Sequence, residues 1–147
     1  MKPRIILLED DDAMRKGISM LLKRSGYEVL SASDPGLCPI YPSENAHCDH
    51  KDSCGDFLLT DNQMPNMTGL EFIEAQNRRG CKGVIRNKAV MSGSWTQEDQ
   101  EKAKQLGCKI FHKPFDFEEL LDWLEERKSS IPADRTLVDF TDKLVTD

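Results

Sequence analysis

The sequence predicts an α/β fold in which a parallel sheet of five strands is covered by helices on both faces. Five short apolar runs of strand length alternate along the chain with segments of helical periodicity. Such alternation is typical of parallel sheets whose crossover helices cover both faces. Four of the runs also end at polar or charged residues. Because open parallel sheets bind ligands outside the carboxyl ends of their strands, we expect a functional site at that edge.

The first part of the chain is predicted to form three strands and two helices. The strands are residues 5–8, 27–31 and 57–60. Apolar residues at i, i+4, i+7 and i+8 indicate the first helix, which ends at Gly26: Met14, Ile18, Leu21 and Leu22. The second helix begins at residues 68–71 (TGLE), which resemble a capping box, and Leu70, Phe72 and Ile73 form its inner face.

The second part adds two strands and two helices. The strands are residues 89–91 and 109–111. Residues 96–106 have Thr96 and Asp99 at cap spacing but only Ala103 and Leu106 as apolar anchors, so this helix should be loosely held. The last helix is capped by Asp116, with Glu119 three residues on. Its inner face consists of Leu120, Trp123 and Leu124.

Two segments do not fit this alternation of strands and helices. Residues 34–56 stand where a crossover helix is expected, but they carry three prolines within residues 35–42 and then a Cys/His-rich stretch. Proline disrupts helices, so an irregular insert should replace the second crossover helix. Residues 129–147 form a polar tail that we expect to dock against the domain or to remain mobile. Residues 1–128, with the insert, should form the single domain.

Composition excludes several function classes. The chain of 147 residues has 20 basic and 26 acidic side chains, a net charge of −6, and no basic cluster larger than a pair. Nucleic-acid binding is therefore not expected. No apolar run approaches the length needed to span a bilayer, and the N-terminus lacks a signal-peptide pattern, so we expect a cytoplasmic protein without a membrane partner.

The polar strand ends carry the predicted chemistry. Glu9 and Asp10 follow the first strand and Asp61 follows the third, so the three carboxylates converge if the first strand is central. Three hard oxygen donors suit Mg²⁺, which would relieve their repulsion and leave one acid free as a nucleophile toward phosphorus. Ser92 and Lys113, at the ends of the fourth and fifth strands, offer a hydroxyl and a positive charge to a phosphoryl group.

These motifs together resemble the receiver domain of response regulators, the phosphoacceptor module of two-component signalling. The resemblance rests on residues 7–15 (LLEDDDAMR), 60–70 (TDNQMPNMTGL), 91–93 (MSG) and 113–115 (KPF), and it covers about residues 4–128. It implies a flavodoxin-like fold with strand order 2-1-3-4-5 and a cis peptide bond before Pro114.

The resemblance also implies roles for individual residues. Asp61 would be phosphorylated by a sensor histidine kinase, Ser92 would bind a phosphoryl oxygen, and Lys113 would pair with the phosphate. The magnesium ligands would be Glu9, Asp10, Asp61 and the backbone carbonyl of Gln63. Gln63 and Ser94 occupy positions that tune acyl-phosphate hydrolysis in this family.

One family feature is absent. Ile110 stands three residues before the lysine, where the family commonly has a switching Tyr or Phe. Phe111 is adjacent, but strand alternation points it to the opposite face. We therefore expect the signal to be transmitted without the usual aromatic residue.

The insert contains five residues of types that commonly bind metals: Cys38, His47, Cys48, His50 and Cys54. Thiolates and imidazoles at this density can bind Zn²⁺ tetrahedrally, although no CxxC pair is present. Reduced cysteines in an ordered loop, or a disulfide such as Cys38–Cys54, are the alternatives.

The sequence therefore predicts a stand-alone phosphorylation switch that acts by binding an unknown downstream protein and has no independent substrate. One alternative is a metal- or redox-responsive adaptor that uses the insert. Another is a magnesium-dependent phosphohydrolase, but such enzymes carry a second aspartate two residues beyond the nucleophile, where this chain has Gln63.

Overall fold

In a computed structural model of the chain, five parallel strands form one sheet in the order β2-β1-β3-β4-β5. The structure describes residues 2–33, 54–65, 67–78 and 87–137. The strands are β1 (Arg4–Leu8), β2 (Glu28–Ala32), β3 (Phe57–Asp61), β4 (Lys88–Ser92) and β5 (Lys109–His112). The helices are α1 (Asp12–Arg24), α2 (Gly69–Arg78), α3 (Gln97–Gln105) and α4 (Phe117–Lys128). The predicted fold class and strand order are confirmed, whereas most of the insert at residues 34–56 lies outside the described residues.

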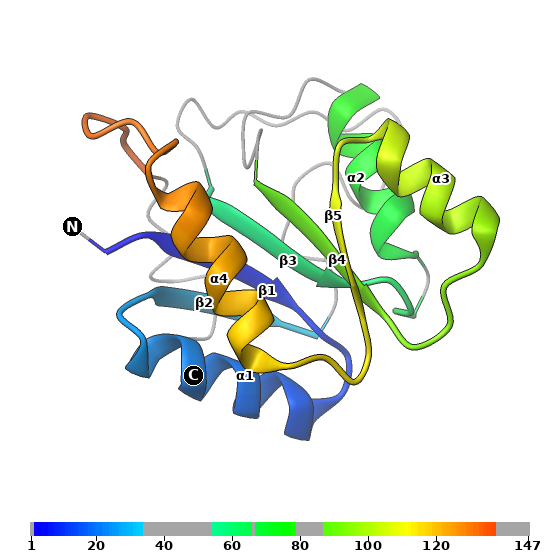
Figure 1. Cartoon of the computed structure of the whole chain (residues 1–147), viewed down its shortest axis with the longest axis horizontal. Coiled ribbons are helices and arrows are strands. Elements are labelled where there is room, and N and C mark those ends of the chain that lie inside the picture. The colour runs from blue at the N-terminus through cyan, green and yellow to red at the C-terminus, as the bar shows by residue number, and fades with distance from the viewer. Residues whose placement is uncertain (1, 34–53, 66, 79–86, 138–147) are drawn as a thin grey trace.

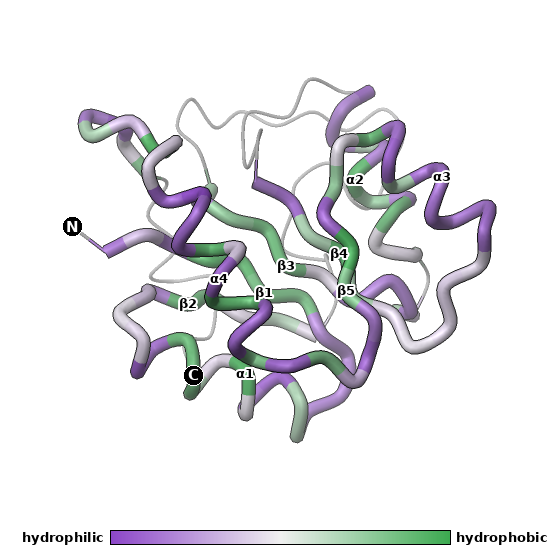
Figure 2. Tube along the Cα trace, in the orientation of Figure 1, coloured by the Kyte–Doolittle hydropathy of each residue, from purple (hydrophilic) through white to green (hydrophobic). Residues whose placement is uncertain are grey.

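The helices form a layer on each side of the sheet. Helices α1 and α4 lie on one face and α2 and α3 on the other (Figure 1). Each layer has its own apolar cluster: Ile18, Leu22, Leu120 and Trp123 belong to the first, and Leu70, Ile73 and Ala103 to the second. The strands between them are mainly hydrophobic, and hydrophilic residues lie along the helices (Figure 2). Burial of both sheet faces explains why the strands are nearly continuous apolar runs.

Side-chain caps fix where the helices begin. Thr68 and Glu71 form the predicted capping box, in which each side chain accepts a hydrogen bond from the other residue's backbone N–H, at 3.1 and 2.9 Å. Thr96 accepts from the N–H of Asp99, and Asp116 caps α4. Because caps satisfy N–H groups that have no partner within the helix, they define the loops that lead from the strands.

The two neighbours on β5 face opposite layers, as alternation predicts. Phe111 is fully buried in the cluster with α4, whereas Ile110 packs against the cluster beneath α2 and α3. Ala103 is the buried residue of α3, which agrees with the predicted weak anchoring of this helix. The face of β5 toward α3 therefore presents an aliphatic side chain.

Residues 129–137 run back from α4 toward the amino ends of the strands. Ile131 packs against the first apolar cluster. Arg135 binds both carboxylate oxygens of Asp56, at 2.7 and 2.6 Å, and the backbone N–H of Arg4 donates to the same carboxylate at 2.8 Å. The segment is thus tied to the residue just before β3. Within the described ranges, no helix combines the length and apolarity needed to cross a membrane.

Candidate functional site

Strand register brings the predicted site residues to one edge of the sheet. Leu8 of β1 pairs with Thr60 of β3, so the residues that follow, Glu9 and Asp61, are neighbours. Asp61 pairs with Met91, which places Ser92 one residue beyond it on β4. Ser92 in turn accepts a hydrogen bond from the backbone N–H of Lys113 at 2.8 Å. Four neighbouring strands therefore deliver the functional groups.

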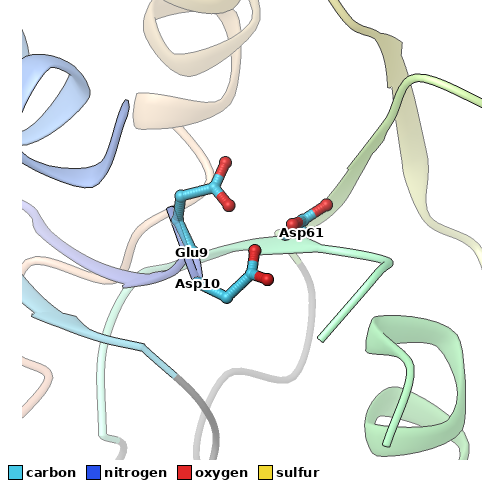
Figure 3. Close-up of side chains that lie close together, drawn as sticks. All are labelled: Glu9, Asp10 and Asp61. Carbon is cyan, nitrogen blue, oxygen red and sulfur yellow. The ribbon is translucent and has the colours of Figure 1, made fainter. Parts of the chain in front are cut away.

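Three carboxylates form the centre of the site. Ligand oxygens of Glu9, Asp10 and Asp61 lie within 4.8 Å of one another. Figure 3 shows their carboxylates gathered where β1 and β3 end. Glu9 is fully buried and Asp61 is 4% exposed, whereas Asp10 is exposed. Hard oxygen donors at this spacing, open to water on the Asp10 side, fit the preferences of Mg²⁺.

Lys113 neutralises part of this acidic cluster. Its Nζ lies 2.5 Å from Oε1 of Glu9 and 3.3 Å from Oδ1 of Asp61. Burial acts to lower the pKa of Lys113, but the hydrogen bond to Glu9 and the charges of Asp61 and Glu9 outweigh it and raise that pKa. The lysine therefore remains a cation at neutral pH. The Lys113–Pro114 peptide bond is cis, as the family resemblance implies.

The crowding of carboxylates alters their protonation. Burial, the hydrogen bonds with Glu9 and Asp10 and the negative charge of Glu9 together raise the pKa of Asp61 to about 7, against the opposing charge of Lys113. Burial also acts to raise the pKa of Asp10, but hydrogen bonds with Asp61 and Glu9 outweigh it and lower that pKa. Among these two carboxylates, protonation is therefore favoured on Asp61 and ionisation on Asp10. A bound cation would displace a proton from Asp61, because it favours the ionised carboxylate.

The loops after β3 and β4 contact each other beside Asp61. The backbone N–H of Gln63 donates to Oδ1 of Asp61 at 3.3 Å, and its side-chain Nε2 donates to Oγ of Ser94 at 2.6 Å. The N–H of Ser94 in turn donates to Oγ of Ser92 at 3.1 Å. Ser92 is 1% exposed. These contacts join Gln63, Ser94 and Ser92 in one chain of hydrogen bonds beside the carboxylate.

Asn62 and Gly69 hold the start of α2 against β3. The Asn62 side chain accepts from the N–H of Leu70 at 3.1 Å, and its backbone oxygen accepts from Gly69 at 3.0 Å. A Cβ at Gly69 would lie 2.6 Å from the carbonyl oxygen of Asp61. Glycine is therefore required for this close approach, which sets the position of the Asp61 backbone.

Most of the chain matches one known protein family. The model of the response regulator receiver domain matches residues 5–125. The chain belongs to the response regulator receiver family. The family match includes the site residues that follow β1, β3, β4 and β5, from Glu9 to Lys113. Members of this family are signalling modules that accept a phosphoryl group and bind Mg²⁺ through acidic residues.

Individual relatives agree with this placement. This receiver is 30% identical over 111 residues to the transcriptional regulatory protein FixJ of Azorhizobium caulinodans, covering 75% of this chain and 47% of FixJ. It therefore spans about half the length of that curated relative. A receiver domain protein from Methanospirillum hungatei superposes with a TM-score of 0.69 at 25% identity, covering 88% of this chain and 96% of the other. The structure of FixJ-N superposes with a TM-score of 0.68 at 18% identity, covering 90% and 98% of the two chains.

The candidate zinc residues fall largely outside the described part of this receiver. Cys38, His47, Cys48 and His50 lie there, so the proposed zinc site stays a prediction. Cys54 is described and half-buried, and its backbone oxygen accepts from Nη1 of Arg4 at 3.0 Å. Within the described ranges, the metal-capable cluster is the one at Glu9, Asp10 and Asp61.

Three supporting residues of the site were not predicted from the sequence. Arg15 binds the backbone of Glu9, Asn62 fixes the loop beyond Asp61, and Gly69 permits its close packing. All three residues lie within the sequence motifs named above, and Asn62 directly follows Asp61. Their position in these motifs was the available signal, but their partners depend on loop geometry that spacing does not define.

Proposed function

We propose that this receiver is a phosphorylation-dependent switch in which Asp61 accepts a phosphoryl group from the phosphohistidine of a sensor histidine kinase. The observation that carries the proposal is the contact of Lys113 with both Glu9 and Asp61, beside three clustered carboxylates. An acid at this position is poised for nucleophilic attack, and a fixed cation lies where phosphoryl charge would accumulate.

In the proposed transfer, an oxygen of ionised Asp61 attacks phosphorus in line with the leaving imidazole. The O–P bond forms as the P–N bond breaks, and the imidazole departs with the electron pair. The Nζ of Lys113, already 3.3 Å from Asp61, would pair with the phosphoryl oxygens. Bound Mg²⁺ would supply charge neutralisation, with Glu9, Asp10, Asp61 and the Gln63 backbone carbonyl as its proposed ligands.

The proposed output is a change at the α3–β5 face. Ser92 would donate its hydroxyl to the phosphoryl group and draw its loop toward Asp61. Trp95 belongs to this loop and ties it to β5, because its Nε1 donates to the carbonyl oxygen of Phe111 at 2.9 Å. Movement of the loop would therefore reach α3, whose anchoring rests largely on Ala103. A downstream protein would bind the altered face.

The two alternatives have less support. A phosphohydrolase would need a second acid two residues beyond Asp61, but Gln63 occupies that position and its side chain bonds to Ser94. The metal- or redox-responsive adaptor depends on an insert that lies mostly outside the described residues. A phosphorylation switch therefore agrees best with the described geometry.

The decisive experiment exposes the full chain to acetyl phosphate, or to beryllium fluoride, with Mg²⁺. We expect one phosphoryl group by intact-mass spectrometry, together with altered Trp95 fluorescence and amide shifts near Asp61. Asp61→Asn should abolish the response, and the matched control Asp122→Asn, an exposed acid on α4, should retain it. An unresponsive wild type, or equal labelling of Asp61→Asn, would contradict the proposal.

A further inference from the structure

Arg15 joins the loop that carries Glu9 and Asp10 to the first turn of α1. Its Nη1 donates to the backbone carbonyl of Glu9 at 3.0 Å, and its Nη2 donates to Oδ1 of Asp12 at 2.6 Å. The Arg15 side chain is 15% exposed, whereas that of Asp12 is 76% exposed. One guanidinium thus contacts both ends of a loop of four consecutive acids.

The contact with Glu9 fixes more than a single oxygen atom. The Glu9 carbonyl belongs to the planar peptide unit that joins Glu9 to Asp10, so holding this oxygen restricts how the next residue is presented. A hydrogen bond within the same loop also restrains it, because the N–H of Asp11 donates to Oε2 of Glu9 at 3.3 Å. Asp11 also turns back to cap α1 by accepting from Met14 at 2.9 Å. The direction of the Asp10 carboxylate therefore depends on a loop that Arg15 closes.

Lys113 and Arg15 have different roles in this arrangement. Lys113 contacts the carboxylates themselves, where a phosphoryl group would be bound. Arg15 contacts backbone on the α1 side and leaves the carboxylate oxygens of Glu9 and Asp10 to other partners. We propose that Arg15 is a positioning residue for the divalent-cation site, which orients the Glu9–Asp10 peptide so that both carboxylates can face one ion. This inference rests on the proposed magnesium site.

A role of Arg15 through its charge and a role through orientation of the loop predict opposite changes in Mg²⁺ affinity when Arg15 is removed. If Arg15 acted only through its charge, its removal would leave the acidic loop more negative and Mg²⁺ would bind more tightly. If it acts by orientation, removal would free the loop and Mg²⁺ would bind more weakly. Residues that orient metal ligands typically contribute tenfold or more to metal affinity. The sign of the change therefore separates the two roles.

The test measures Mg²⁺ affinity of the full chain by calorimetric titration for wild type, Arg15→Gln, Arg15→Lys and Lys16→Gln. Lys16 is the control, because it is an exposed cation on the same helix and its loss makes the same charge change. We expect Arg15→Gln to weaken binding about tenfold. Arg15→Lys should also weaken it, since one ammonium does not reproduce the two-pronged contact, and Lys16→Gln should leave it unchanged or slightly tighter.

A second readout excludes a general loss of stability. Melting temperatures of each variant are compared in EDTA and in saturating Mg²⁺, and the positioning role predicts a smaller Mg²⁺-induced increase for Arg15→Gln. Arg15→Lys keeps the charge and provides the same comparison if the glutamine variant does not fold. Unchanged or tighter binding in both Arg15 variants would overturn the inference. Failure of wild type to bind Mg²⁺ would instead overturn the magnesium site itself.

Discussion

Gln63 and Ser94 are joined side chain to side chain beside Asp61, with 2.6 Å between Nε2 of Gln63 and Oγ of Ser94. The loops after β3 and β4 are thereby connected by an exposed hydrogen bond. Ser94 also donates its N–H to Ser92, so the connection reaches the proposed switch residue. These contacts hold the two loops together beside the carboxylate of Asp61.

The first prediction is that Gln63 and Ser94 influence acyl-phosphate hydrolysis as one unit. Gln63→Ala and Ser94→Ala should each speed loss of the phosphoryl group, because either change opens the approach of water to Asp61. A hydrogen bond of ordinary strength, about 1 kcal/mol, corresponds to roughly a fivefold change in rate. The decay of phosphorylated protein after removal of acetyl phosphate measures it.

The double variant provides the control for this prediction. If the two side chains act through their shared hydrogen bond, Gln63→Ala/Ser94→Ala should decay no faster than either single variant. Multiplicative effects of the two changes would instead show that the two positions act independently.

The second prediction concerns Gly69 at the start of α2. In Gly69→Ala the new Cβ would lie 2.6 Å from the carbonyl oxygen of Asp61 and 3.0 Å from Cγ2 of Thr60. Backbone cannot yield as a flexible side chain does, so either α2 or the end of β3 must shift. We expect a loss of about 2 kcal/mol in the free energy of unfolding by urea titration, and slower phosphorylation.

Gly17→Ala is the matched control, since its Cβ would have no described neighbour within 4 Å and the position lies inside α1. This change should stabilise the protein by about 0.5–1 kcal/mol, because alanine favours helix over glycine. Equal destabilisation by the two substitutions would contradict the proposed steric clash.

Local patterns were sufficient to predict the fold class and the order of the elements along the chain. Each strand is a short apolar run, and each described helix has a readable cap or apolar stripe. The strand order within the sheet was predicted from the family resemblance, because local patterns do not specify which strands are neighbours. The carboxylate cluster was also predictable. Parallel strands align their carboxyl ends, so Glu9 and Asp61 become neighbours once β1 is central.

What the sequence did not predict are contacts that depend on the exact paths of loops. Arg135 and Asp56 are 79 residues apart, and nothing in the composition of either segment indicates their pairing. The Gln63–Ser94 bond likewise requires two loops to converge, although each residue was singled out by its family position. Such contacts depend on three-dimensional placement and have no period or spacing in the chain.

The third prediction concerns the Arg135–Asp56 ion pair. The Asp56 side chain is 4% exposed, and Arg135 donates two of the three hydrogen bonds described for its carboxylate. Arg135→Ala would leave a buried charge poorly compensated, which should cost about 3 kcal/mol in the free energy of unfolding. Arg135→Lys should recover part of the loss, because it restores charge but lacks the two-pronged geometry.

Arg127→Ala serves as the control for this prediction, because Arg127 is an exposed arginine near the end of α4. It should change stability by less than about 0.5 kcal/mol. If Arg135→Ala were equally harmless, the ion pair between Arg135 and Asp56 would not contribute to the stability of the receiver.

The fourth prediction is a pH dependence of stability that originates at Asp61. In the absence of divalent cations the folded pKa of Asp61 is about 7, against an ordinary value of 3.8. Between these values the folded state retains a proton that the unfolded state has released, so the free energy of unfolding falls as pH rises through this window. Above pH 7 the folded protein holds an ionised Asp61 among other acids, and the resulting decrease in the free energy of unfolding is complete.

Asp61→Asn should remove this penalty, because asparagine keeps the shape but cannot ionise. In EDTA at pH 8 we expect the variant to be more stable than wild type by roughly 1–3 kcal/mol, with little difference at pH 4. Urea titrations at both pH values measure it, and Asp122→Asn should follow wild type throughout. Saturating Mg²⁺ at pH 8 should reverse the order, since the cation stabilises the ionised cluster of wild type and binds Asp61→Asn more weakly. Equal stability of Asp61→Asn and wild type at pH 8 in EDTA would show that the acidic cluster does not strain the folded protein.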